Sequence, residues 1–100
     1  MTTSSRVHAV LFTKDKCKPC TETKLFISDF LDHYPGLADG LSILKKENHS
    51  ALVEAYNLEL FPTLLITGPN GHEFERVVGG QAIRDCIESK LIDIYRENHL

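Results

Sequence analysis

The sequence has few cysteines, no long hydrophobic run and no excess of positive charge. Its 100 residues include three cysteines, whereas a disulfide-dense scaffold carries a much larger share. No apolar stretch approaches the roughly 18 residues that can span a bilayer, and the first residues lack the basic and then apolar pattern of a secretory signal. The formal net charge of −3 gives no electrostatic reason to expect a nucleic-acid partner. We therefore expect a cytoplasmic protein that binds neither nucleic acid nor membrane.

What the sequence does contain is the composition of an ordinary globular domain. Hydrophobic residues make up 42% and charged residues 25%, which disfavours intrinsic disorder. A domain of this length buries roughly 60–65% of its unfolded surface and needs no covalent staple to fold. We predict a single domain over residues 1–100, with residues 1–5 as a flexible tail, and a monomeric protein.

Hydrophobic patterning predicts alternating strands and helices. Continuously apolar or alternating segments indicate strands at residues 6–12, 41–44, 63–67 and 72–78. Apolar spacings of three and four indicate a helix that ends at Pro35-Gly36, a second one ending near residue 56 and a third at 81–98. The order β-α-β-α-β-β-α predicts parallel strands joined by crossovers, then an antiparallel pair. We expect an α/β fold, a four-stranded mixed sheet flanked by three helices.

Each predicted helix has an apolar face that should contact the sheet. In the first helix this face comprises Phe26, Ile27, Phe30, Leu31 and Tyr34. The second helix, capped by Asn48 or Ser50, has an inner face of Ala51, Leu52, Ala55 and Tyr56. The third helix carries Ile83, Ile87, Leu91 and Ile94 in one stripe. The run 72–78 puts Phe74 and Val78 on one face and Glu73, Glu75 and Val77 on the other, which predicts a half-exposed edge strand.

Cys17 and Cys20 are the residues that most need a function, because the fold does not need them as a staple. Cys17 follows a predicted buried strand and begins a predicted helix, where free N–H groups and the helix dipole favour an anion. The pKa of its thiol should therefore fall below the ordinary value of about 8.5. Lys14, Lys16 and Lys18 add positive charge nearby, although they could equally be a solvated loop face. Cys20 lies one helical turn on and can resolve a mixed disulfide formed at Cys17.

Other interpretations of the cysteines are weaker. A zinc site needs two more ligands, and neither Cys86 nor any of the five histidines forms a second closely spaced pair. An inert structural disulfide across so short a loop would stabilise the fold little. Cys86 lies beside Ile83 and Ile87, as a small buried apolar residue would, with a regulatory or intermolecular thiol as the alternative. The histidines are scattered and are expected to be surface groups.

Pro62 is a second signal, at the start of the predicted strand 63–67. Since only about 5–6% of X-Pro bonds are cis, the sequence pattern alone predicts a trans bond before it.

The cysteine motif belongs to a recognisable pattern. Cys17-Lys18-Pro19-Cys20 resembles the Cys-Gly-Pro-Cys site of thioredoxins, and Phe61-Pro62-Thr63-Leu64 resembles their Ile-Pro-Thr-Leu element. The segments 70–73 and 78–80 are similar to the hairpin and glycine that follow in that family, so the likeness extends over roughly residues 6 to 98.

The resemblance to the thioredoxin-like superfamily implies roles for the matched residues. Cys17 would be the nucleophile and Cys20 the resolving thiol, with no metal and no cofactor beyond this pair. Pro62 would be cis and packed against the pair, while the Phe61 backbone would pair with an extended substrate chain. Gly79 and Gly80 would leave room for that chain. Supporting residues in the cysteine loop would be Lys16, Lys18 and Pro19.

The sequence also departs from thioredoxins. Their N-terminal strand and helix have no counterpart, which leaves the minimal core found in glutaredoxins. Lys16 stands where thioredoxins have a tryptophan, Leu11 where they have a buried aspartate, and Ile43 near the position of a buried lysine.

We predict a thiol–disulfide oxidoreductase that reduces protein disulfides and is itself reduced by thioredoxin reductase or glutathione. The nearest alternative is a glutaredoxin-like enzyme, for which Val78-Gly79-Gly80 is suitable. However, Pro19 lies one position later than in that motif, and Gln81-Ala82 replaces an acidic residue. The other alternative is a binding subunit without turnover, suggested by the missing tryptophan and by Leu11.

Overall fold

The computed structural model describes residues 8–34, 40–68 and 71–91, except for the side chains of residues 90 and 91. The predicted tail 1–5, the helix stop at 35–36 and the predicted helical residues 92–98 lie outside these ranges. The elements in chain order are β1 (His8–Thr13), α1 (Lys18–His33), β2 (Leu41–Lys45), a 3₁₀ turn (Lys46–Asn48), α2 (Ser50–Ala55), β3 (Thr63–Thr67), β4 (Glu73–Val78), α3 (Gly80–Cys86) and a π-helical turn (Ile87–Leu91). This confirms the predicted order and the mixed sheet with three helices. None of the described helices is long and apolar enough to cross a membrane.

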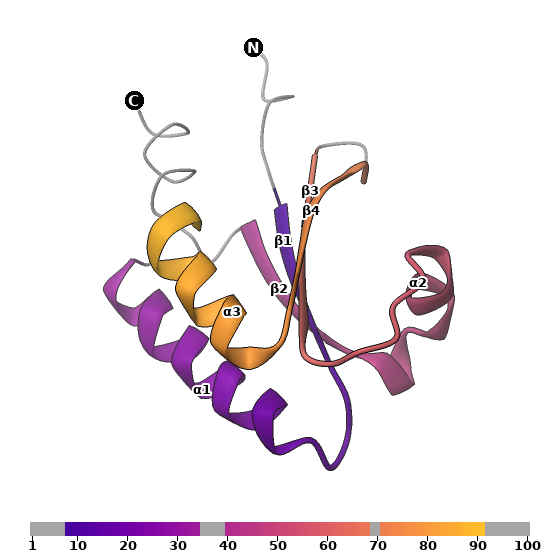
Figure 1. Cartoon of the computed structure of the whole chain (residues 1–100), viewed down its shortest axis with the longest axis horizontal. Coiled ribbons are helices and arrows are strands. Elements are labelled where there is room, and N and C mark those ends of the chain that lie inside the picture. Colours follow the sequence, from indigo (N-terminus) through magenta and orange to yellow (C-terminus); the bar gives the residue numbers. More distant parts are fainter. Residues whose placement is uncertain (1–7, 35–39, 69–70, 92–100) are drawn as a thin grey trace.

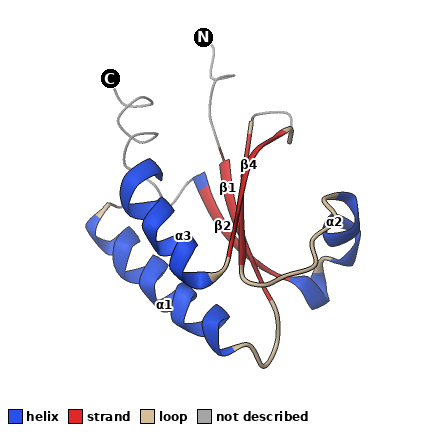
Figure 2. Ribbon diagram, viewed as in Figure 1, coloured by secondary structure: helices blue, strands red, loops and turns tan. Residues whose placement is uncertain are grey.

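The sheet has the strand order β2-β1-β3-β4, with α1 and α3 side by side on one face and α2 on the other (Figures 1 and 2). β1 and β2 are parallel, as predicted, and β3 and β4 form the predicted antiparallel pair. The prediction that β3 also runs parallel to β1 is wrong, because Phe12 lies opposite Thr63 in an antiparallel register.

The length of α2 explains this reversal. Its six residues span about 9 Å at 1.5 Å per residue, whereas the five residues of β2 span about 16 Å. The connection therefore does not carry the chain back along the sheet, and β3 begins at the end of the sheet where β2 stops.

The larger core cluster fills the space between the sheet and the pair α1/α3. Its buried members are Ala9, Leu11, Ile27, Phe30, Leu64, Ile66, Ile83, Cys86 and Ile87, with Phe26, Leu31, Leu41 and Val77 packed at its edge. The predicted stripe of α1 is confirmed except at Tyr34, which lies just past the helix end and is 36% exposed. In the predicted stripe of the last helix, the structure confirms Ile83 and Ile87, and it does not describe the side chains of Leu91 and Ile94.

The face of α2 differs from the prediction. Ala51, Leu52 and Ala55 are exposed, while Val53 and Tyr56 pack on the smaller core cluster of Phe12, Leu58 and Leu65. The N-cap is His49, without a side-chain cap, rather than Asn48 or Ser50. Asn48 belongs to the 3₁₀ turn, and α2 begins at Ser50. The inward position of Tyr56 is as predicted, whereas Val53 takes the place expected for Leu52.

β4 is the predicted edge strand of the sheet. Phe74 and Val78 are 61% and 42% exposed, and Val77 points to the larger core cluster, as predicted. Glu73 departs from the predicted alternation, because it pairs with Arg76 on the α2 side of the sheet and not on the face of Val77. Pairing with β3 shifts by one residue at Phe74, which has no partner in the register.

Candidate active site

Cys17 is held at the amino end of α1. β1 ends at Thr13, three loop residues follow, and Cys17 has an extended backbone as the N-cap of the helix. Its sulfur accepts a hydrogen bond from the backbone N–H of Cys20 at 3.2 Å. Pro19 lies in the first turn, where a missing N–H costs no helical hydrogen bond. The local sequence thus aims the Cys17 sulfur at the free N–H groups of the helix.

The two cysteines form a disulfide, with their Cα atoms 5.2 Å apart. Cys17 is 8% exposed and Cys20 2%, so Cys17 is the more accessible of the pair. A reduced sulfur at the Cys17 position would accept the same backbone hydrogen bond and face the positive end of the helix dipole. Both effects favour the thiolate, which is the attacking form of cysteine.

The Phe61-Pro62 segment comes close to this pair through the backbone of Phe61. The Phe61-Pro62 bond is cis, which agrees with the resemblance and not with the base rate for proline. The carbonyl oxygen of Phe61 is 3.9 Å from the Cys17 sulfur. The Pro62 carbonyl accepts a hydrogen bond from the Gly79 N–H at 3.0 Å. Three segments distant in sequence therefore meet at one point.

The two glycines after β4 have different surroundings. Gly79 has a φ of +98°, and a Cβ added to it would meet nothing within 4 Å. Gly80 instead packs closely on α1, because an added Cβ would lie 2.9 Å from the Thr23 hydroxyl oxygen. Gly79 thus borders open space beside Pro62, whereas Gly80 allows α3 to approach α1.

The structure adds a group that the sequence pattern did not single out. Lys46 lies with its ammonium 5.4 Å from the centre of the Phe61 ring. Asp15, in the loop before Cys17, pairs with Lys45 at 3.0 Å and donates its backbone N–H to Glu47. The hydrogen bond and charge of Asp15 raise the pKa of Lys45. The predicted parallel pairing of β1 and β2 could have indicated these contacts, because it brings the residues that follow the two strands close together.

The three predicted loop lysines Lys14, Lys16 and Lys18 are all exposed. Lys16 has a φ of 55°, in the left-handed region that non-glycine residues seldom occupy.

The positions that depart from thioredoxins hold apolar side chains. Leu11 is fully buried in the larger core cluster, and Ile43 is 38% exposed on β2. Neither can carry a proton. Among the described residues, no three His, Cys, Asp or Glu side chains lie together as a metal site would require.

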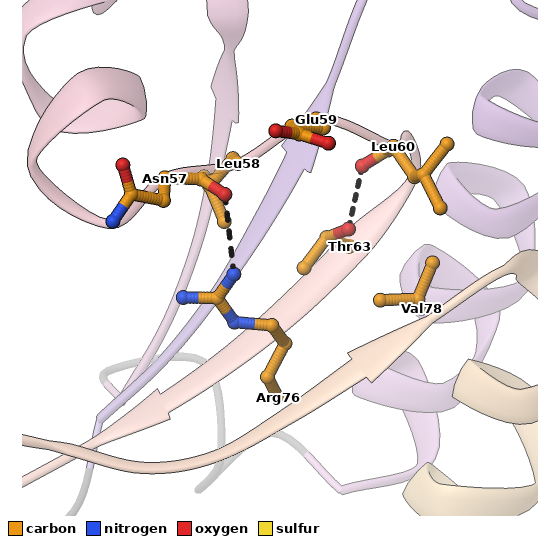
Figure 3. Close-up of a pocket in the computed structure, with 7 residues that line it drawn as sticks. All are labelled: Asn57, Leu58, Glu59, Leu60, Thr63, Arg76 and Val78. Carbon is orange, nitrogen blue, oxygen red and sulfur yellow. Dashed lines mark hydrogen bonds between the residues drawn. The ribbon is translucent and has the colours of Figure 1, made fainter.

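A shallow pocket of about 170 Å³ lies next to the site, on the α2 side of the sheet (Figure 3). Its lining residues are Asn57, Leu58, Glu59, Leu60, Thr63, Arg76 and Val78. Two of the polar side chains here are paired within the protein. The Thr63 hydroxyl donates to the Leu60 carbonyl at 2.6 Å, and Arg76 donates to Glu73 and to the carbonyls of Tyr56 and Asn57. The hydrogen bond from Arg76 lowers the pKa of Glu73.

The fold of this chain is similar to that of solved thioredoxin structures. No protein-family model matches the chain, and no curated protein matches it at a significant level. Thioredoxin NaTrxh from Nicotiana alata superposes with a TM-score of 0.75 at 24% identity, covering 89% of this chain and 73% of its own. The thioredoxin of Trypanosoma brucei brucei has a TM-score of 0.73 at 20% identity, covering 93% of this chain and 78% of its own. A mutant thioredoxin from Halobacterium salinarum has a TM-score of 0.64 at 27% identity, covering 85% and 74%.

The chain is therefore thioredoxin-like in its fold and in its closely spaced cysteine pair. This combination supports a thiol–disulfide oxidoreductase as the general class.

Proposed function

We propose that this protein reduces protein disulfides by dithiol exchange, with Cys17 as nucleophile and Cys20 as resolving thiol. The observation that carries the proposal is the Cys17 sulfur at the N-cap of α1, bonded to the Cys20 N–H and 3.9 Å from the Phe61 carbonyl. A cytoplasmic location, where thiols are kept reduced, is part of the proposal.

The reaction has two exchange steps. The Cys17 thiolate attacks one sulfur of the substrate disulfide, and the other substrate sulfur leaves as a thiolate and takes up a proton. Cys20 then loses its proton to water and attacks the Cys17 sulfur. The Cys17–Cys20 disulfide forms and the second substrate thiol leaves. A reductant such as thioredoxin reductase or glutathione supplies the two electrons that restore the dithiol.

Groups of the protein near Cys17 would assist both exchange steps. The Cys20 N–H and the helix dipole stabilise the Cys17 thiolate. The Phe61 backbone, close to the Cys17 sulfur, would pair with an extended substrate chain, and Gly79 leaves space for that chain. Leu11, which stands where thioredoxins have a buried aspartate, cannot accept a proton, so the proton of Cys20 must leave by another route.

Reduction of insulin disulfides with dithiothreitol as reductant tests this function. The wild type should accelerate precipitation of the insulin B chain, and Cys17→Ser should abolish the acceleration. Cys86→Ala serves as the matched control, because Cys86 lies in the larger core cluster and not in the pair. Acceleration by Cys17→Ser equal to that of the wild type would contradict the proposal.

A second candidate is glutathione-dependent reduction, which the open space at Gly79 favours. Turnover of a glutathione mixed disulfide, without activity on insulin, would support it over protein reduction. Trapping with Cys20→Ser separates both enzymes from a binding subunit, because only an enzyme should be captured as a mixed disulfide through Cys17.

A further inference from the structure

Two lysine-rich segments leave the sheet together at the end that carries Cys17. Thr13 pairs with Lys45 at the last position of the parallel strands β1 and β2, so the residues after them emerge side by side (Figure 1). Asp15 ties the segments through Lys45 and Glu47. We name residues 14–18 and 45–47 the lysine corner. It contains five lysines and two carboxylates, a net charge of +3 in a chain whose net charge is −3.

Both carboxylates of the lysine corner interact with groups within the corner. Asp15 is paired with Lys45, and Glu47 accepts the Asp15 backbone N–H. Lys14, Lys16 and Lys18 are exposed, and none of them forms an ion pair with any described residue. Their charges are therefore directed to solvent or to a partner.

Three of the lysines adjoin Cys17, either along the chain or through Phe61. Lys16 and Lys18 are the chain neighbours of Cys17 on either side. Lys46 approaches from the other segment, over the ring of Phe61, whose carbonyl is 3.9 Å from the Cys17 sulfur. A disulfide that reaches Cys17 must therefore enter a positive field, which attracts acidic groups and repels basic ones.

We propose that the lysine corner selects protein disulfides flanked by acidic residues, with Lys16, Lys18 and Lys46 as specificity-determining residues. The proposal rests on the proposed disulfide reduction and names the class of substrate for it. The preference arises mainly in association, because exposed charges steer the encounter more than they hold the complex.

Three peptides with the same intramolecular disulfide, flanked by aspartates, serines or lysines, test the preference. The reduced protein is mixed with each peptide, and the second-order rate constant is measured at low and high salt. We expect the acidic peptide to react about tenfold faster than the neutral one at low ionic strength, and the lysine peptide more slowly than both. At 1 M salt, where the screening length is about 3 Å, the difference should nearly vanish.

The combined variant Lys16→Gln/Lys18→Gln/Lys46→Gln should reduce the acidic-to-neutral rate ratio to about 2 or less. The ratio is the readout, because loss of positive charge near the Cys17 sulfur also makes the thiolate less favourable and changes the rates of all three peptides together. Lys24→Gln is the matched control, since Lys24 is an exposed lysine of α1 outside the corner, and it should keep the wild-type ratio.

The outcomes separate the two ideas. If the wild type reduces all three peptides at equal rates, the proposed function stands and the specificity is overturned. A ratio that persists in the triple variant also overturns it. If the wild type reduces none of the peptides, the proposed function itself fails.

Discussion

The two faces of the sheet are covered very differently. On one face, α1 and α3 enclose a cluster of nine buried residues, while on the other, α2 covers three. The covered face holds the helix that carries Cys17, and the thinly covered face holds the pocket and the bonds of Arg76. The molecule thus has a rigid support on one side of its site and a lightly packed, polar surface on the other.

Different interactions stabilise the two faces of the sheet. Apolar burial dominates beneath α1 and α3, where removing a side chain leaves a cavity. On the α2 side, hydrogen bonds connect segments that share little apolar contact. The Tyr56 hydroxyl donates to the Gly71 carbonyl at 2.7 Å, and Arg76 joins β4 to the residues after α2. Such bonds contribute less each, and mostly through groups near solvent.

The largest expected effect comes from one truncation on each face. Ile27→Ala, beneath α1 and fully buried, should lower the free energy of unfolding by about 4 kcal/mol. Leu58→Ala, in the smaller core cluster and 7% exposed, should cost about 2 kcal/mol, because its surroundings can collapse more easily. Urea unfolding measures both. Equal costs would show that the two faces are packed alike.

A smaller effect is expected where the covered face is tightest. Gly80→Ala should cost about 1–2 kcal/mol, because the new methyl group would press on the Thr23 hydroxyl. Thr23→Ala in the same chain should recover part of that cost, which a double-mutant cycle in thermal unfolding would detect. Gly79→Ala is the control: its cost comes from a φ of +98°, so Thr23→Ala should not relieve it. An additive cycle for Gly80 and Thr23 would contradict the contact.

The smallest expected effect is a pH dependence on the thinly covered face. Arg76 holds the pKa of Glu73 below the 4.5 usual for glutamate, so the pair stabilises the fold above that pH. This contribution is lost as the pH falls through the lowered pKa. Arg76→Gln should cost about 1 kcal/mol at pH 7, mostly through its lost hydrogen bonds to backbone carbonyls.

The pH-dependent share of that cost should be about 0.5 kcal/mol, because both side chains are about one third exposed. It should disappear as the pH falls through the lowered pKa of Glu73, as measured by unfolding at a series of pH values. Arg84→Gln on α3, whose guanidinium is bonded to Gln81, is the matched control and should show no such change. An undiminished cost of Arg76→Gln at pH 3 would show that Glu73 takes no part.

Much of this architecture follows from local sequence patterns. The spacing of Ile27 and Phe30 predicts the buried face of α1, and the continuous apolar run at 63–67 predicts β3. The direction of β3 could not be predicted in this way, because it depends on the length of α2 and on its 3₁₀ start. Nor could the pattern show that Val53 rather than Leu52 faces the core, because both side chains are apolar and α2 is only six residues long.

Part of the site was also predictable. The position of Cys17 between a strand and a helix indicates an N-cap, and the structure places it there. The cis bond at Pro62 required the family resemblance, because the local pattern favours trans. Lys46 and Thr23 were missed, since a cation over a ring and a helix-to-glycine contact depend on tertiary packing.

The antiparallel pairing of Phe12 with Thr63 also bears on how the site assembles during folding. Cys17 and Cys20 are close in sequence and can form their disulfide in a largely unfolded chain. The Phe61 carbonyl reaches them only after two segments half a chain apart have paired, a slow, non-local step with a high loop-closure entropy. A peptide covering the first helix alone would hold both sulfurs and could be oxidised. It would not have the surface that Pro62 and Gly79 provide, so substrate recognition should appear only with the complete fold.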